Sequence, residues 1–215
     1  VHKQPVGGLV TKHMFRTNKE FCDWLFTNEH KGYTCIAHYS KGYDIHHIKQ
    51  YLYNNEIELN FNSIDQGNKS MYLTVKKLNI RFIDSISFFM CSLRELPKTF
   101  GLTEAKKGYF PHFFNKPENY SYVGPIPDKS YYGYNSMKTK DAKEFDKWFD
   151  SVKETTFNFE KEFSAYCESD VQVLRESWNA FTTLFTSLEI TPGVTNNLNP
   201  ASYITLASYV QAIYR

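Results

Sequence analysis

Phe163-Ser-Ala-Tyr-Cys-Glu-Ser-Asp-Val-Gln-Val-Leu174 is the most informative stretch of this 215-residue sequence. It belongs to a helical pattern that we expect to run from residue 159 to residue 188. Tyr166 and Asp170 are four residues apart, so a helix places the phenol and the carboxylate on one face, one turn apart. A carboxylate can hold Mg²⁺ or Mn²⁺, and a phenol beside it can orient a water molecule. The helix therefore predicts one part of a hydrolytic site.

The segment Ala37-His-Tyr-Ser-Lys-Gly-Tyr-Asp44 carries the second candidate carboxylate. Residues 33–38 form a β-prone run, and a helical pattern starts at Gly42 and continues to Tyr53. A strand therefore leads into a loop that ends in the carboxylate of Asp44. Asp44 and Asp170 are hard oxygen ligands from distant parts of the chain. Together the two segments predict metal-dependent cleavage of a phosphodiester.

The rest of the chain alternates helical and strand patterns, which predicts an α/β domain. Residues 101–140 have little periodicity and many Pro, Gly and Tyr residues, and a loop of that length is usually functional or flexible. The other expected elements are a helix over 18–30 capped by Asn18, a hairpin of strands 58–62 and 71–75 around residues 65–68, a buried strand over 80–84, and helices over 141–152 and 199–214.

The composition is that of one soluble domain, with 41% hydrophobic and 22% charged residues. A formal net charge of +2 is too small to argue for nucleic-acid binding by itself. No apolar run approaches the ~20 residues of a membrane span, and the amino terminus is not a signal peptide. The four cysteines are far apart and form no Cys-x-x-Cys pair, so we expect buried thiols in an intracellular reducing compartment and no secretion.

The two motif segments resemble the second and third exonuclease motifs of family-B DNA polymerases of the protein-primed viral, plasmid and Maverick transposon type. The resemblance covers roughly residues 18 to 190 in order and spacing. It rests also on the segments Arg81-Phe-Ile-Asp-Ser85, Leu96-Pro-Lys-Thr-Phe-Gly-Leu102, Lys106-Lys-Gly-Tyr-Phe-Pro-His112, Tyr122-Val-Gly-Pro125 and Tyr166-Cys-x-x-Asp-Val171.

The resemblance implies a ribonuclease-H-like fold, with a mixed sheet flanked by helices, that removes mismatched 3′ nucleotides with two Mg²⁺ or Mn²⁺ ions. It makes Asp44 and Asp170 metal ligands, gives Tyr166 the attacking water, and gives Lys107 a supporting role on the phosphate. The implied partners are the 3′ end of single-stranded DNA, a terminal priming protein and the polymerase domain of the same protein, with no membrane. The residues implied to contact DNA are His38, Tyr43, Ser85 and Lys107.

Two departures from the family pattern affect the expected activity. No Asp-x-Glu, the family's first motif, precedes Asp44, and Tyr39 stands where the family normally has Asn. We therefore expect residues 1–190 to be an exonuclease domain without its first motif-bearing strand. Within it, residues 101–140 would be an extended basic and aromatic loop. Over the segment from Lys98 to Lys140, aromatic rings alternate with Lys98, Lys106, Lys107, Lys116 and Lys129. Residues 191–215 would begin the connection to a polymerase domain.

Each assignment has a simpler alternative. Asp44 could cap the helix that follows it, and Asp170 could be a solvated helix residue. Tyr166 could pack in the core, and His38 and Tyr43 could pack around the loop. Asp84 ends an apolar strand, where we expect a structural hydrogen bond rather than metal ligation. The alternative function is a non-catalytic module that binds single strands or the priming protein.

Overall fold

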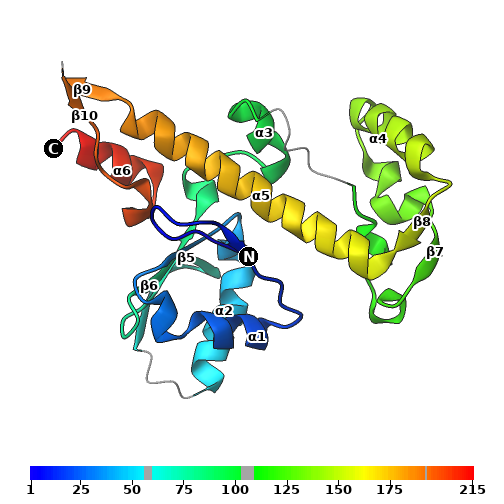
Figure 1. Ribbon diagram of the computed structural model, residues 1–215, viewed down its shortest axis with the longest axis horizontal. Coiled ribbons are helices and arrows are strands. Elements are labelled where there is room, and N and C mark those ends of the chain that lie inside the picture. The colour runs from blue at the N-terminus through cyan, green and yellow to red at the C-terminus, as the bar shows by residue number, and fades with distance from the viewer. Residues whose placement is uncertain (56–59, 103–108, 192) are drawn as a thin grey trace. The chain divides into compact units, whose positions relative to one another are not determined.

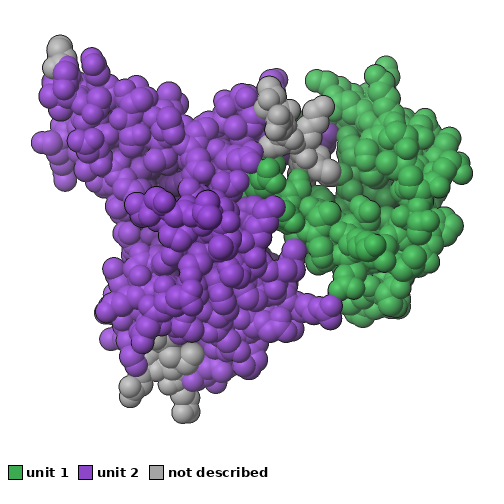
Figure 2. Space-filling model, in the orientation of Figure 1, with its two compact units in different colours: residues 1, 104–173 green, residues 2–103, 174–215 purple. Residues whose placement is uncertain are grey.

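The computed structural model describes residues 1–55, 60–102, 109–191 and 193–215 (Figure 1). The chain divides into two compact units (Figure 2). Unit 1 contains Val1 and residues 104–173, and unit 2 contains residues 2–103 and 174–215. The long helix α5 (Phe159–Thr186) contributes residues to both units.

Unit 2 is built around a four-stranded mixed sheet with the strand order β3-β6-β5-β4. Strand β3 runs parallel to β6, while β6 with β5 and β5 with β4 are antiparallel. The parallel register pairs Ala37 with Asp84, so β3 and β6 end beside each other. The strands are β3 (Thr34–Ala37), β4 (Phe61–Gln66), β5 (Lys69–Val75) and β6 (Ile80–Asp84).

Helices α1 (Asn18–Leu25) and α2 (Asp44–Asn54) share one hydrophobic core with this sheet. In α2 the buried residues Ile45, Ile48 and Leu52 recur at helical spacing. In β6, Ile80 and Phe82 alternate into the same core. Burial of this apolar face, at about 25 cal/mol per Å², stabilises the sheet and orients the amino-terminal end of α2.

The second half of α5 packs on aromatic residues that follow β6. The ring centroids of Phe88 and Trp178 are 5.0 Å apart, and those of Phe89 and Phe181 are 5.1 Å apart. The carboxy-terminal end of unit 2 adds Tyr209, which is fully buried. This end consists of α6 (Leu206–Ile213) and a hairpin of β9 (Glu189–Thr191) and β10 (Val194–Thr195). Unit 2 also contains β1 (His2–Lys3), β2 (Thr11–Lys12) and α3 (Leu96–Thr99).

Unit 1 has an aromatic core instead of a large sheet. Phe110, Phe157 and Phe159 are buried together, and Tyr166 packs against them. A short strand β7 (Val123–Pro125) pairs antiparallel with β8 (Thr156–Asn158). We expected residues 101–140 to be an extended loop. Their described part contains one strand and several short 3₁₀ helices. The helix α4 (Thr139–Val152) follows it.

The architecture confirms the predicted fold class, because a mixed four-stranded sheet flanked by helices is compatible with a ribonuclease-H-like fold. Some local predictions were wrong. The cap of α1 is Thr17, whose side chain accepts from the Glu20 amide, and Asn18 is the first helical residue. The helix expected over 18–30 ends at Leu25, and the helix expected over 199–214 begins at Leu206. The four cysteines are free, as predicted, but only Cys22 is buried and the other three are half-buried. Within the described ranges, no helix is long and apolar enough to cross a membrane.

Candidate functional site

The carboxylate of Asp84 holds the loop that carries the first candidate motif. Asp84 is 2% exposed at the end of β6. Its Oδ1 accepts from the backbone amides of Tyr39 at 2.7 Å and Ile86 at 3.1 Å. Its Oδ2 accepts from the amide of Lys41 at 2.9 Å. Three such bonds compensate the burial of a charge and leave Asp84 little capacity as a metal ligand, which confirms its predicted structural role.

Tyr39 adopts an uncommon backbone conformation at the start of this loop. Its φ is 63° and its ψ is 24°, which is the left-handed region. Outside glycine, Asn and Asp are the residues that tolerate this region best. The Asn that the resemblance implies at this position would suit this conformation better than Tyr. The hydrogen bond from the Tyr39 amide to Asp84 holds the strained residue, and its side chain is 60% exposed.

Asp44 is the first residue of α2 and lies directly after this loop. The helix cap is Tyr43, and no side chain caps this helix end. The capping alternative for Asp44 is therefore wrong, although an acidic residue in the first turn suits the helix dipole. Taken over the whole residue, Asp44 is exposed to solvent. Partial burial of its carboxyl group, and more weakly the charge of Asp84, raise its pKa, while its own backbone amide and His47 act in the opposite direction.

His38 is positioned by Ser85. The Ser85 hydroxyl donates to the carbonyl of Ala37 at 3.0 Å, and its oxygen lies 2.9 Å from His38 Nδ1. A serine hydroxyl has one proton, so the second bond requires His38 to donate from Nδ1. Ser85 is fully buried, so it can orient His38 but does not offer its hydroxyl at the surface. Sequence patterns missed this bond because it joins residues 47 positions apart.

Two tyrosines on the loop are open to solvent. Tyr43 is 69% exposed, and its ring makes an edge contact with His47 at a centroid distance of 4.7 Å. With Tyr39 it gives the loop two exposed aromatic side chains beside Asp44. Exposed rings of this kind stack on the bases of single-stranded nucleic acids. The prediction that Tyr43 contacts DNA stays a prediction.

Unit 1 carries the second candidate motif on α5. Tyr166 is half-buried, with its ring 5.4 Å from that of Phe110 and 5.3 Å from that of His112. Its ring is thus part of the unit 1 core, as the alternative for Tyr166 stated, and the role of its hydroxyl remains a prediction. Asp170 lies one turn further along the same helix and is also half-buried. It is therefore not the fully solvated helix residue of the simpler alternative.

The metal ions implied by the family resemblance need more ligands than these residues provide. Across the described ranges, no group of three or more His, Cys, Asp or Glu side chains is arranged to hold a metal ion. In unit 2, Asp84 is occupied by backbone amides, which leaves Asp44 as the carboxylate of that loop. The described residues therefore do not form a complete metal site. Lys107, the predicted phosphate contact, lies outside the described residues.

The sequence of this chain is similar to those of known proteins. A probable DNA polymerase of Ascobolus immersus is 30% identical over 139 residues, which cover 64% of this chain and 11% of that protein. A probable DNA polymerase of Neurospora intermedia is 27% identical over 130 residues, which cover 59% of this chain and 13% of that protein. The chain thus spans only a small part of the length of these relatives. No solved structure matches it.

A family model described as DNA polymerase type B, organellar and viral, matches residues 26–215. The match includes β3, the loop clamped by Asp84, Asp44 and all of α5. The chain therefore belongs to the organellar and viral type B DNA polymerases.

Proposed function

We propose that this chain provides the 3′–5′ exonuclease function of a type B DNA polymerase that copies DNA from a protein primer. Its substrate would be the 3′ end of single-stranded DNA. The observation that carries the proposal is the clamp by Asp84, whose three amide bonds fix the loop before Asp44. A preorganised loop that presents an exposed carboxylate suits a ligand role, because no capping bond occupies Asp44.

The proposed roles follow from the chemistry of each side chain. Asp44 and Asp170 would each supply oxygen ligands to Mg²⁺ or Mn²⁺, alongside further carboxylates that the described residues do not provide. Tyr166 would hold a water molecule through its hydroxyl, with its ring fixed by Phe110 and His112. Lys107 would neutralise phosphate charge.

On the DNA side, His38 and Tyr43 would contact the single strand, and Ser85 would orient His38 through the bond to Nδ1. Tyr43 is exposed enough to stack on a base. The other proposed partners are the terminal priming protein and the polymerase domain of the same protein. The proposed compartment is intracellular and reducing, which agrees with four free cysteines.

A second candidate function is a non-catalytic module that binds single-stranded DNA or the priming protein. The observation that favours it is the lack of a three-ligand group among the described residues. The exposed rings of Tyr39 and Tyr43 would serve this function equally well. A strand with an Asp-x-Glu motif upstream in the parent gene would support the nuclease.

The test uses the parent polymerase. Asp44→Ala or Asp170→Ala should abolish 3′–5′ degradation of a labelled oligonucleotide and leave primer extension largely intact, because the resemblance assigns synthesis to a separate palm domain. Tyr166→Phe should slow degradation less, since the packed ring remains. Thermal melts of each variant report folding. Wild-type degradation by Asp170→Ala with an unchanged melt would remove α5 from the site.

A further inference from the structure

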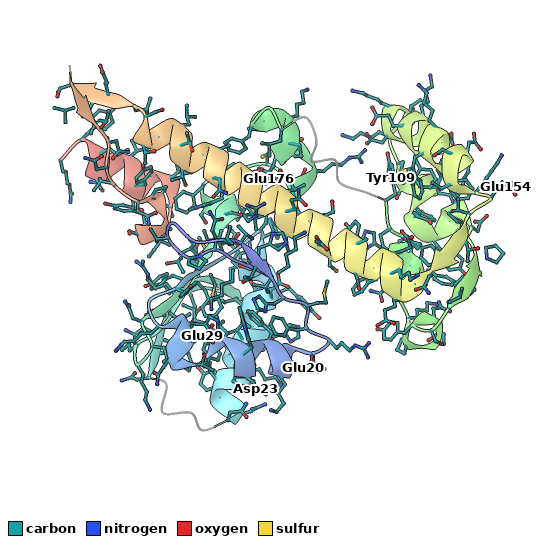
Figure 3. The ribbon with its side chains drawn as sticks, in the orientation of Figure 1. Glu20, Asp23, Glu29, Tyr109, Glu154 and Glu176 are labelled. Atoms are coloured by element: carbon teal, nitrogen blue, oxygen red, sulfur yellow. The ribbon has the colours of Figure 1, made fainter. Side chains whose placement is uncertain are left out.

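Unit 1 contains a pocket apart from the candidate motifs. Its volume is about 110 Å³, below the range of sites for whole small molecules. Its aromatic wall consists of Tyr109 (labelled in Figure 3), Tyr132 and Trp148. The ring of Trp148 is 4.9 Å from that of Tyr109 and 5.5 Å from that of Tyr132. All three rings pack on the fully buried Phe145, which gives the wall a rigid support.

The rest of the described lining is apolar except for Thr155, Thr156 and one charged residue. Ile126 and Val152 add aliphatic surface, and Glu162 from the first turn of α5 adds a carboxylate. Among the residues that the structure describes, no lysine or arginine lines the pocket. Among the described residues, Glu162 has no hydrogen-bond or ion-pair partner of its own. Burial, followed by the negative charge of Glu162, raises the pKa of Tyr132, which indicates that the carboxylate acts on the aromatic wall.

The chemistry of this lining disfavours nucleotides and favours cations. A nucleotide would bring phosphate charge next to Glu162, and no basic residue of the described lining would compensate it. A cation gains from aromatic faces and from a carboxylate. An arginine side chain fits both parts of the lining, because its apolar stem matches Ile126 and Val152 and its planar guanidinium stacks on rings and pairs with carboxylates.

We propose that this pocket binds an arginine side chain presented by a protein partner. The aromatic wall would stack on the guanidinium group, and Glu162 would accept its hydrogen bonds. The site can be tested separately from the nuclease proposal, since none of its lining residues is a candidate catalytic, metal-binding or DNA-binding residue. It gives unit 1 a protein-binding role.

The test measures binding of short blocked peptides to the 215-residue chain by NMR. The probe signal is the indole N–H of Trp148, assigned with Trp148→Phe. Peptides of the form acetyl-Gly-X-Gly-amide, with X as Arg, Lys or Gln, are titrated beside thymidine monophosphate. The arginine peptide should shift the Trp148 signal saturably, and the glutamine peptide should not.

The variants Glu162→Gln and Glu160→Gln separate the pocket from general charge attraction. Both residues are exposed and lie in the first turn of α5, but only Glu162 lines the pocket. Glu162→Gln should weaken the arginine peptide about fivefold or more, and Glu160→Gln should leave its affinity unchanged. Equal losses, or no saturable shift, would overturn the proposal. Equal binding of the lysine peptide would overturn the choice of arginine, and binding of thymidine monophosphate alone would make the pocket a nucleotide site.

Discussion

Two residues of this chain are in unusual states, Tyr39 in its backbone conformation and His30 in its burial. Tyr39 is in the left-handed region, where a bulky residue is strained by about 1 kcal/mol or more, and a buried carboxylate holds its amide. His30 is 1% exposed between Trp24 and Tyr33, with Thr27 at its Nδ1. Both states are consequences of tertiary contacts, and both lead to measurable effects.

We expect Tyr39→Asn to stabilise the protein by about 0.5–1 kcal/mol, because Asn tolerates the left-handed region better than Tyr. The amide bond to Asp84 should remain, since it involves only the backbone of residue 39. Urea unfolding measures the change. Tyr39→Ala is the control, because it also removes the ring but keeps the unfavourable conformation. If the two variants were equally stable, the strain argument would fail.

His30 should make stability depend on pH. Burial of the ring, and then the charge of Lys3, lower its pKa from the ordinary value, while Glu29 and the Trp24 carbonyl oppose them. In the unfolded chain, His30 therefore takes up a proton at about pH 6.5, whereas in the folded state it does so only at lower pH.

The free energy of unfolding should thus fall as the pH decreases through this range and be unaffected by His30 above about pH 7.5. Urea unfolding at pH 7.5 and pH 5.5 should show a smaller loss for His30→Gln than for the wild type. The same loss in both proteins would exclude His30 as the titrating group.

At the scale of elements, the junction of β3, β6 and α2 determines where Asp44 lies. The parallel pairing of β3 and β6 brings Ala37 beside Asp84, and Asp84 then ties down the loop leading to α2. The buried face of α2 fixes the helix against the sheet. The loop is therefore held at both ends, by hydrogen bonds at one and by apolar packing at the other.

Asp84→Asn tests this junction. An amide side chain keeps one acceptor oxygen but places an NH₂ group where a second acceptor is needed, so the amide of either Lys41 or Tyr39 loses its partner. We expect a loss of about 2 kcal/mol in the free energy of unfolding. Asp65→Asn, which alters an ion pair with Lys49 at the sheet's other edge, should cost less, because Asp65 is exposed. A cost below that of the control would contradict the clamp.

At the scale of the whole molecule, the two candidate motifs belong to different compact units. Asp44 is in unit 2, and Tyr166 and Asp170 are in unit 1, with α5 contributing to both. Lys107 and its neighbours from 103 to 108 lie outside the described residues. An activity assay of the 215-residue chain therefore measures the combined effect of units 1 and 2.

We expect this chain alone to bind single-stranded DNA with an affinity that falls steeply as salt increases, and to degrade a 3′-labelled oligonucleotide very weakly with Mg²⁺ or Mn²⁺. The reason for weak cleavage is that the described residues hold no three-ligand group. Fluorescence anisotropy of a labelled strand measures binding, and Lys107→Ala should weaken it more than Lys161→Ala. Rapid cleavage that Asp170→Ala abolishes would show that two carboxylates suffice.

The sequence by itself determined the fold class, because the 3.6-residue periodicity of the helices and the alternation along β5 reflect which residues are buried. It also determined the structural role of Asp84, since a carboxylate at the end of an apolar strand must be hydrogen-bonded. Only the tertiary structure decided what that carboxylate bonds, that Thr17 rather than Asn18 caps α1, and that residues 123–125 pair with residues 156–158. These features depend on contacts between distant residues, and local patterns carry no signal of such contacts.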